Sequence, residues 1–443
     1  MSVESWTFKV LNGIYLTHPR TISLPYISRI TFHDSMQAIQ YVKSIPRYLT
    51  VRLLGKRWNW LYTSSASCIR LTKIGTPQLP TPDWVKIKTR LSGICGSDLG
   101  LITAKGSPYF SPFTSFPFVP GHEVVGEVAE TGSPIEGAAV GNRVVIEPVL
   151  SCEVRGIRPR CDQCQLGRFA NCENITRGNI SAGIQTGYCR DTGGGWSPYF
   201  VAHKSQIHHV PDNLPDEIAV LIEPFACALH GVLRAELKDA DEILILGAGT
   251  VGLLTVASIR ALGKSNRILI VAKYPHQQKL AIELGANEIL APGKDLYTSF
   301  CHLTDAECHQ PELGKPVLLG GVDVTFDCVA SASTIDDALR FTRAQGRVML
   351  IGMPAIPKSI DWTSIWYKQL KVSGAYAYGL ENYEGMQIRT FTLGIQLLQQ
   401  MGTSLLPLVG ERFPLKDYRQ AIQSALYTGQ SGSVKTVFDL RLS

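Results

Sequence analysis

The spacing of apolar residues divides the chain into two regions of different character. From about Met36 to Pro215, short apolar or alternating segments are broken by glycine and proline, a pattern that predicts a mainly β region. The expected strands are MQAIQYVKS, which begins at Met36, followed by YLTVRLL, WVKIKTRL, HEVVGEV and NRVVIEP. We therefore expect a domain built chiefly from short strands and turns.

The pattern changes between about Glu217 and Val372, where apolar runs of strand length alternate with stretches of helical periodicity. The expected strands are EILILG, RILIVA, VDVTFDCVA and RVMLIGM, and the expected helices include TVGLLTVASIRALG and HQQKLAIELGA. Such alternation is typical of βαβ units. The predicted fold class is therefore α/β, with a doubly wound parallel sheet beside a mainly β domain. The chain then returns to mixed structure, with a last strand expected in SVKTVFDL.

Composition narrows the functional classes. The chain has 443 residues, 45% of them hydrophobic and 18% charged, which is ordinary for a globular protein. Its net charge of +6 is spread along the chain, and no basic block predicts a nucleic-acid partner. No stretch of about 18 apolar residues occurs, so we expect neither a membrane-spanning helix nor a membrane partner.

The N-terminus and the cysteines bear on the compartment. The first residues, MSVESWTFKVLNGIYL, lack the basic start, long apolar core and cleavage site of a secretory signal. Eleven cysteines in such a chain predict metal or thiol chemistry in a reducing compartment. We expect the protein to be cytoplasmic.

A glycine-rich turn indicates a dinucleotide site. Gly247, Gly249 and Gly252 in ILILGAGTVGLL have GxGxxG spacing between an apolar strand and a helix. The first glycine allows a tight turn, the second lets the backbone approach a pyrophosphate, and the third lets the helix pack closely. The helix begins with Thr250 and Val251, and its N-terminus would face the phosphates. All five residues are candidate cofactor contacts.

The residues after the next strand bear on the choice of cofactor. An acidic residue that would bind the ribose 2′-hydroxyl is missing after RILIV, where Ala272 and Lys273 stand instead. A lysine there attracts a 2′-phosphate that a carboxylate would repel, so we favour NADP(H) over NAD(H). His276 and Lys279 are weaker candidates for the same phosphate. The alternative is that Lys273 is only a solvated surface charge and that selectivity rests elsewhere.

Four cysteines, Cys152, Cys161, Cys164 and Cys172, form a first metal signal. The segment CDQCQLGRFANC has C-x2-C-x7-C spacing, which can fold a loop around a structural zinc with four thiolate ligands. Cys152 is the least certain ligand, because it precedes Cys161 by more than the usual spacing. Disulfides are the rival interpretation, which a reducing compartment disfavours.

A second metal signal combines GICGSD with VPGHEVVGEV. Cys95, His122 and Glu123 offer a sulfur, a nitrogen and an oxygen, a set that suits a catalytic zinc with one position open. Glu223, in LIEPFACALHG, is an alternative third ligand that could displace Glu123 or alternate with it. Taken singly, His122 could be a satisfied core histidine, and Glu223 a carboxylate at a helix N-terminus. Their occurrence together with the cysteine loop and the glycine turn favours the metal.

With these motifs the chain resembles the zinc-dependent medium-chain alcohol and polyol dehydrogenases, over roughly residues 36–443. The resemblance rests on GICGSD, GHEVVGEVAETG, GNRVV, the cysteine loop, EPFACALHG, GAGTVG and SGSVKTVFDL. Within that family it is closest to the sorbitol and threonine dehydrogenase branch, in which a Glu-Pro pair stands in for the third zinc cysteine of other members.

The resemblance implies a GroES-like catalytic domain, a Rossmann dinucleotide-binding domain and two zinc ions, one catalytic and one structural. The implied organisation is an extension over residues 1–35, the catalytic domain over 36–216, the Rossmann domain over 217–372 and a return to the catalytic domain over 373–443. A homodimer or homotetramer acting on a small-molecule alcohol or carbonyl compound is implied as well.

Proton transfer is where the chain departs from the family pattern. In similar enzymes a Ser or Thr two residues after the zinc cysteine starts a proton relay, and Ser97 fits that role. A histidine five residues after the cysteine often ends the relay, but Gly100 stands there. Another group, water or the substrate itself must then take the proton. Asp98 is expected to hold the loop.

The expected activity is hydride transfer between NADP(H), or NAD(H), and a secondary alcohol or ketone, with polyols, cyclitols and sugars as leading substrates. The aromatic segment YFSPFTSFPF suggests instead a reductase of hydrophobic aldehydes or ketones, although its rings could equally pack the loop. A third possibility is a non-catalytic relative that binds NADPH and zinc, for which Gly100 is the one argument. The three glycines at 193–195 predict a tight turn or bulge near the cofactor domain, and Cys189 is expected to be structural.

Overall fold

The computed structural model describes residues 35–135 and 138–442 of the chain. The predicted N-terminal extension therefore lies outside the described residues, apart from Ser35, which begins the first strand. Within the described ranges, no helix combines the length and the apolar character needed to cross a lipid bilayer.

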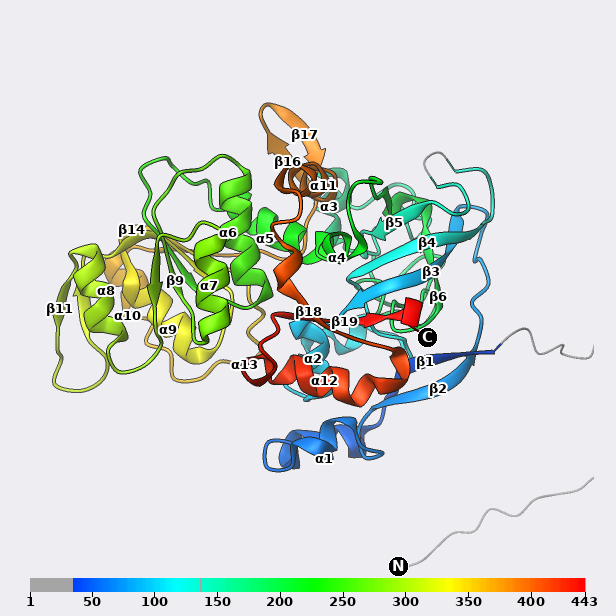
Figure 1. Ribbon diagram of the computed structural model, residues 1–443, viewed down its shortest axis with the longest axis horizontal. Coiled ribbons are helices and arrows are strands. Elements are labelled where there is room, and N and C mark those ends of the chain that lie inside the picture. The colour runs from blue at the N-terminus through cyan, green and yellow to red at the C-terminus, as the bar shows by residue number, and fades with distance from the viewer. Residues whose placement is uncertain (1–34, 136–137, 443) are drawn as a thin grey trace, which may run out of the picture. The chain divides into compact units, whose positions relative to one another are not determined.

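A seven-stranded sheet carries the first part of the structure (Figure 1). Its long central strand, β3 (Trp84–Gly93), pairs antiparallel with β4 (Val124–Thr131) on one side. On the other side β3 pairs with β6 (Tyr199–His203) and β19 (Lys435–Asp439). The sheet is extended by β5 (Arg143–Ile146), β7 (Ile207–His209) and β18 (Val409–Phe413). The last strands of the chain thus complete a sheet that begins much earlier in the sequence.

The second sheet has six strands, and every neighbouring pair is parallel. Its strands in spatial order are β10 (Glu288–Leu290), β9 (Ile268–Val271), β8 (Ile243–Leu246), β13 (Val322–Asp327), β14 (Thr342–Leu350) and β15 (Lys371–Gly374). This is the strand order of the Rossmann fold. The order in which strands are added to the sheet reverses next to the first strand, and this leaves a crevice there for a dinucleotide.

Helices cover both faces of the parallel sheet, as its apolar strands require. On β8, Ile243 and Ile245 pack into one hydrophobic core, whereas Leu244 and Leu246 pack into another on the opposite face. The helices beside this sheet are α6 (Thr250–Ala261), α7 (Pro275–Glu283), α8 (Leu296–Thr304), α9 (Ala332–Phe341) and α10 (Thr363–Lys368). The continuous apolar runs of the sequence therefore correspond to strands buried on both sides.

Further helices connect the two sheets or pack beside them. They are α2 (Gly96–Ile102), α3 (Asp162–Gln165), α4 (Asp216–Ala219), α5 (Ile222–Arg234), α11 (Thr390–Met401), α12 (Tyr418–Leu426) and α13 (Thr428–Ser431). Two short hairpins complete the structure, β11 (Glu307–His309) with β12 (Val317–Leu319) and β16 (Leu380–Tyr383) with β17 (Met386–Arg389). The amphipathic helix α5 packs against both α6 and α11.

One predicted strand is wrong. The segment YLTVRLL lies in helix α1 (Ile45–Leu54), which stands between β1 (Ser35–Tyr41) and β2 (Ile69–Gly75). Pro46 occupies the first turn, where a missing N–H costs nothing. Tyr48 and Val51, three residues apart, turn the same side of the helix to the core. A short apolar run rich in β-branched and aromatic residues does not distinguish the two structures by itself.

Candidate active site and metal centres

Cys95 lies directly after β3 and caps the N-terminus of helix α2. The backbone N–H of Cys95 donates to Oδ2 of Asp98 at 3.0 Å, and the N–H of Ser97 donates to Sγ of Cys95 at 3.5 Å. This capping box fixes the turn that presents the thiol. Asp98 therefore has the loop-holding role expected of it.

His122 reaches the same place from the residue pair that precedes β4. Its Nε2 lies 3.5 Å from Oγ of Ser97, and its Nδ1 lies 3.7 Å from Oδ1 of Asp98. Burial alone would lower the pKa of His122, but the Asp98 carboxylate and the Cys95 thiol raise it well above its usual value. A carboxylate behind one ring nitrogen leaves the other available as a ligand.

The two candidate glutamates have different partners. Glu123 forms a buried ion pair with Nζ of Lys435 on β19, and its carboxylate occupies the space that a Cβ at Gly93 would need. Glu223, in the first turn of α5, accepts hydrogen bonds from Oη of Tyr378 at 3.2 Å and from Sγ of Cys227 at 3.6 Å.

The charges of Glu223 and His122 interact inside the protein. Burial raises the pKa of Glu223 to about 7, and the positive charge of His122 opposes that rise. Cys95, His122 and Glu223 thus come from three separate segments to one buried region. In the part of the chain that the structure describes, they do not form a group with all ligand atoms within 4.8 Å, whereas the cysteine loop does.

The sulfur atoms of Cys152, Cys161, Cys164 and Cys172 all lie within 4.8 Å of one another, and none forms a disulfide. Backbone N–H groups of Cys161, Glu173 and Asn174 donate to these sulfur atoms, each at 3.4 Å. Amide donors of this kind stabilise thiolates, so the loop suits a tetrahedral zinc with no open position.

Arg155 holds the cysteine loop together from inside. Its guanidinium is fully buried and donates to the carbonyl groups of Leu150, Arg177 and Gly183 at 3.0, 3.0 and 2.6 Å. A buried cation surrounded by carbonyl acceptors folds an irregular lobe that has little regular secondary structure of its own.

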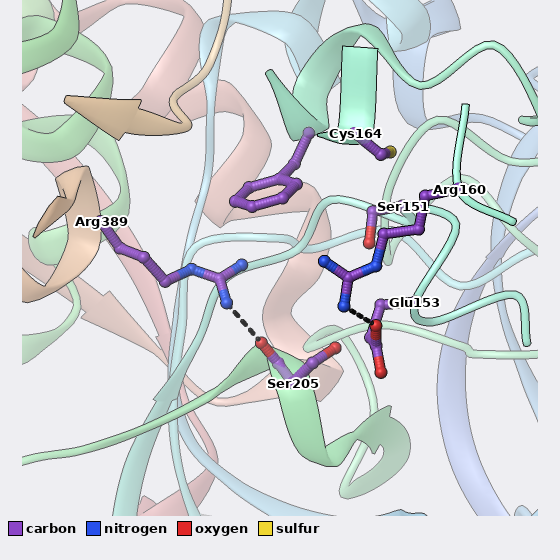
Figure 2. Close-up of a pocket in the computed structure, with 7 residues that line it drawn as sticks. Ser151, Glu153, Arg160, Cys164, Ser205 and Arg389 are labelled. Carbon is purple, nitrogen blue, oxygen red and sulfur yellow. Dashed lines mark hydrogen bonds and ion pairs between the residues drawn. The ribbon is translucent and has the colours of Figure 1, made fainter. Parts of the chain in front are cut away.

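A small pocket of about 130 Å³ lies beside this lobe (Figure 2). The guanidinium of Arg389, from the end of β17, lies 4.7 Å from the ring centre of Phe169 and donates to the carbonyl of Ser205 at 3.4 Å. It also pairs with Glu147 at 3.0 Å. The pocket therefore lies between the cysteine lobe and the end of β17, and neither Cys95 nor His122 lines it.

The glycine turn lies between β8 and α6, with the geometry that GxGxxG spacing predicts. Gly247 has φ of +97°, and a Cβ at Gly252 would overlap the carbonyl oxygen of Gly247. Gly249 caps α6, and Oγ1 of Thr250 donates to the carbonyl of Val434 at 3.2 Å. Val251, the fifth candidate, is half-buried at the start of the helix.

After β9, Ala272 is fully buried and Lys273 is exposed. Nζ of Lys273 lies 5.2 Å from the centre of the Tyr274 ring. The His276 ring stacks on the same Tyr274 ring, with 5.8 Å between the ring centres. Lys279 instead pairs with Glu283 on its own helix at 3.7 Å. Of the two lysines among these candidates, Lys273 is the one that forms no ion pair with a carboxylate in the described residues.

The aromatic segment before His122 divides into two parts. Phe116 and Phe118 pack with Tyr41 in a small hydrophobic core. Phe110 is partly exposed and stacks on Tyr376 with 6.5 Å between ring centres. Tyr376 is affected by the charges of Cys227, Glu223 and Cys95, so it lies at the site. Phe116 and Phe118 therefore pack the loop, whereas a role of Phe110 in selecting an apolar substrate stays a prediction.

Tyr188 is the most informative residue that sequence reasoning missed. Its ring stacks on Phe118 at 5.4 Å and lies 6.0 Å from the His122 ring, measured between centres. Burial and the Asp98 carboxylate raise the pKa of Tyr188 well above its usual value, while a hydrogen bond with Ser97 opposes the rise. Sequence reasoning also missed Tyr376, Tyr378, Cys227 and Lys435. Cys227 and Lys435 lie within EPFACALHG and SGSVKTVFDL, but neither motif assigns them to the site.

The triple glycine at 193–195 offered an indirect signal. The N–H of Gly195 donates to the carbonyl of Gly121 at 2.9 Å, and a Cβ at Gly194 would overlap the carbonyl of Val119. The glycines thus pack against the backbone that leads to His122, and not near the cofactor domain as expected. Cys189 is buried against Ser115 and Ser181, in line with a structural role.

Comparison with known proteins identifies the class. Residues 81–212 match the family model described as alcohol dehydrogenase GroES-like domain, and residues 250–392 match that described as zinc-binding dehydrogenase. The chain belongs to the zinc-dependent medium-chain alcohol and polyol dehydrogenase family. The predicted fold class, a Rossmann sheet with a GroES-like domain, is confirmed.

Individual relatives share less than 30% sequence identity with this chain in the examples that follow. L-threonine 3-dehydrogenase of Aeromonas hydrophila is 29% identical over 371 residues, which cover 84% of this chain and 96% of that protein. L-idonate 5-dehydrogenase of Vitis vinifera is 28% identical over 378 residues, covering 84% of this chain and 93% of that protein. Among solved structures, a putative zinc-binding dehydrogenase from Sinorhizobium meliloti bound to NADP has a TM-score of 0.67 and 25% identity, covering 92% of this chain and all of that one.

Proposed function

We propose that this protein is a zinc-dependent dehydrogenase that interconverts a secondary alcohol and a ketone with NADP(H), and that its substrate is a polyol, cyclitol or sugar. The convergence of Cys95, His122 and Glu223 in one buried region carries the proposal. The threonine and idonate dehydrogenases among the relatives support a hydroxylated substrate.

The donor set fits a catalytic zinc. When bound, zinc polarises an alcohol or carbonyl oxygen, and the nicotinamide accepts or donates the hydride. Cys95, His122 and Glu223 are the ligands that we propose. Glu123 is already engaged by Lys435, so we assign it the role of holding the ligand segment from behind. Cys152, Cys161, Cys164 and Cys172 would hold the structural zinc.

Ser97 and Tyr188 are the groups that we propose to move the proton. Oγ of Ser97 lies 3.5 Å from Nε2 of the ligand His122, where a substrate hydroxyl would reach it. The Tyr188 phenol, whose ring lies 6.0 Å from the His122 ring between centres and which interacts with Ser97, offers the next step along the path. Tyr188 would thereby take the place of the relay histidine, which is missing at Gly100.

Lys273 supports NADP(H) as the cofactor. Its ammonium group is exposed and free of carboxylate partners in the described region, and it follows β9 where the 2′-phosphate of NADP(H) is bound in such folds. A related structure holds NADP.

We propose a homodimer formed at the edge of the parallel sheet. β15 is an outer strand, and the nearby side chains of Met353, Trp362 and Trp366 are largely exposed. An open strand edge next to large apolar side chains invites pairing with a second copy. A Trp366→Ser variant should shift the mass measured by light scattering toward the monomer, and an unchanged mass would contradict this interface.

The reaction can be tested by following nicotinamide absorbance. Zinc-replete protein would be mixed with NADP+ or NAD+ and with separate panels of polyols, cyclitols and hydrophobic secondary alcohols. Turnover of the first two panels with NADP+, abolished in Cys95→Ser, is the expected result. Turnover of the hydrophobic panel alone would favour the reductase of hydrophobic carbonyls, for which the partly exposed Phe110 beside Tyr376 is the supporting contact. NADPH binding without any turnover would favour a non-catalytic relative.

A further inference from the structure

The connection between β1 and β2 is unusually long. The two strands pair antiparallel from Ser35 with Gly75 to Tyr41 with Ile69, an arrangement that a turn of a few residues normally closes. Here residues 42–68, which we call the insertion segment, form α1 and a short 3-10 helix, Asn59–Thr63. The segment precedes the part of the chain that matches the family models. Figure 1 draws α1 at the lower margin of the structure, below α12.

The insertion segment is anchored on one side and apolar on the other. Val51 and Tyr62 pack into the core with Ile94 and Ile102. Six large apolar side chains of the segment are instead exposed: Ile45 by 66%, Leu49 by 45%, Leu53 by 73%, Leu54 by 40%, Trp58 by 48% and Trp60 by 60%. Ile45, Leu49 and Leu53 recur every fourth residue and therefore form one row along α1.

The charge around this row has one sign. Between Ser35 and Pro82 the chain has no Asp or Glu, and its cations are Lys43, Arg47, Arg52, Lys56, Arg57, Arg70 and Lys73. None of these seven forms an ion pair in the described part of the chain. Arg47 and Arg70 also line, with Arg419 and three serines, a pocket of about 360 Å³ that contains no carboxylate.

We propose that the insertion segment docks on the surface of an anionic lipid bilayer. A helix that lies in the membrane interface combines an apolar row, flanking tryptophans and excess basic residues, and the segment has all three. The leucines would enter the acyl boundary, the tryptophans would lie at headgroup level, and the cations would face lipid phosphates. The absence of a spanning helix, which led us to expect no membrane partner, does not bear on this mode of binding.

The positive charge of the insertion segment also favours an anionic bilayer over a second copy of the chain as its partner. A symmetric contact through α1 would bring Lys43, Lys56 and Arg57 close to the same residues of the other copy, with no carboxylate of the segment to offset the repulsion. An anionic bilayer offers opposite charge and an apolar layer together.

Vesicle flotation of the full-length, zinc-replete protein tests the proposal. Vesicles of phosphatidylcholine alone would be compared with vesicles that contain about 30% phosphatidylserine, in about 0.1 M and about 0.5 M salt. We expect binding to the anionic vesicles at least about tenfold stronger than to the neutral ones, and weaker at high salt. Protein that floats with neither kind of vesicle, or equally with both, would overturn the proposal.

Matched variants separate the segment from the rest of the surface. Leu49→Ser/Leu53→Ser and Lys56→Glu/Arg57→Glu should each lower anionic-vesicle binding about tenfold or more. The controls Leu313→Ser, an exposed leucine elsewhere, and Lys294→Glu/Lys358→Glu should bind as the wild type does. Equal losses in variants and controls would overturn the assignment to the segment. A mass that falls toward the monomer in Leu49→Ser/Leu53→Ser, without vesicle binding by the wild type, would assign the face to a second copy instead.

Discussion

Lys435 and Glu123 form an ion pair inside the protein, between β19 near the end of the chain and the residue that follows His122. Both side chains are almost completely buried. The Glu123 carboxylate raises the pKa of Lys435 against the lowering effect of burial, so the lysine stays charged. A segment of the metal site is thus held by a residue more than 300 positions away along the chain.

Removing the cation alone should strongly destabilise the protein. Lys435→Met leaves the Glu123 charge buried without a partner, and we expect a loss of about 3–5 kcal/mol in the free energy of unfolding. The double variant Glu123→Gln/Lys435→Met should recover most of that loss, because no unpaired charge remains. Urea unfolding of the three proteins measures both effects. Equal stability of the single and double variants would contradict the explanation by an unpaired buried charge.

The assignment of the third zinc ligand is open to a direct test by metal analysis. Glu223→Gln should reduce the zinc content from about two ions per chain to about one, whereas Glu123→Gln should keep about two. The reason is that Glu223 interacts with the charge of His122, while Glu123 is held in an ion pair by Lys435. The reverse result would make Glu123 the ligand, and loss of one ion in both variants would mean that both glutamates take part.

Tyr188→Phe should slow the reaction without unfolding the protein. The ring keeps its packing on Phe118 but loses the hydroxyl near Ser97, so we expect kcat to fall about 10- to 100-fold. A Cβ at Gly100 would meet no atom within 4 Å, so a side chain can begin there, and Gly100→His should restore part of the rate in the Tyr188→Phe background. Gly100→Ala is the matched control and should restore nothing. An unchanged kcat in Tyr188→Phe would exclude this route for the proton.

Reversing the charge after β9 should change the cofactor preference. Lys273→Asp places a carboxylate where we expect the 2′-phosphate, and the KM for NADP+ should rise about tenfold or more. The KM for NAD+ should stay the same or fall. Lys358→Asp, at an exposed lysine elsewhere, controls for net charge. Equal changes for both cofactors would place the selectivity at other residues.

The ion pairs of Asp216 should make the stability of the protein depend on pH. Its carboxylate accepts hydrogen bonds from Arg90, Arg143 and Arg441 at 2.7, 2.9 and 2.8 Å. Burial raises the pKa of Asp216, but the three guanidinium groups lower it more, so the folded value lies below the unfolded value of about 3.9. The stabilisation is therefore complete above that unfolded value and is lost as the pH falls through the folded one.

The corresponding experiment compares Asp216→Asn with the wild type by urea unfolding. The variant should be less stable by about 3 kcal/mol near pH 7, and the difference should narrow below about pH 4. Asp239→Asn removes an exposed carboxylate paired with Lys264, and its stability should match that of the wild type at both values. A difference for Asp216→Asn that does not depend on pH would contradict the electrostatic explanation.

Local pattern was sufficient for the features that depend on neighbouring residues. The strand, glycine turn and helix from Ile243 to Ala261 follow one another in sequence, and the spacing of Cys161 and Cys164 is set by a single turn of α3. The same reasoning failed for α1, because a short apolar run has no period long enough to separate a helix from a strand.

Features that depend on distant segments could not be predicted in the same way. Lys435 reaches the site because β19 pairs with β3, and Tyr188 reaches it from an irregular segment, where its ring stacks on Phe118. No spacing rule connects either residue with Cys95. The choice between Glu123 and Glu223 stayed open for a related reason. It depends on which side of the backbone next to His122 each carboxylate occupies, and the partner that decides it, Lys435, lies on another strand.

The hydrogen bond from Thr250 to Val434 links the dinucleotide turn to the segment that holds Glu123. Val434 contacts the first residue of the helix that begins the dinucleotide site, and the next residue in the chain, Lys435, holds Glu123 beside His122. A single peptide unit therefore joins the cofactor side of the molecule to the metal side. We therefore expect any displacement of α6 on dinucleotide binding to reach the candidate metal ligands through that bond, which would couple the two halves of the proposed reaction centre before a substrate binds.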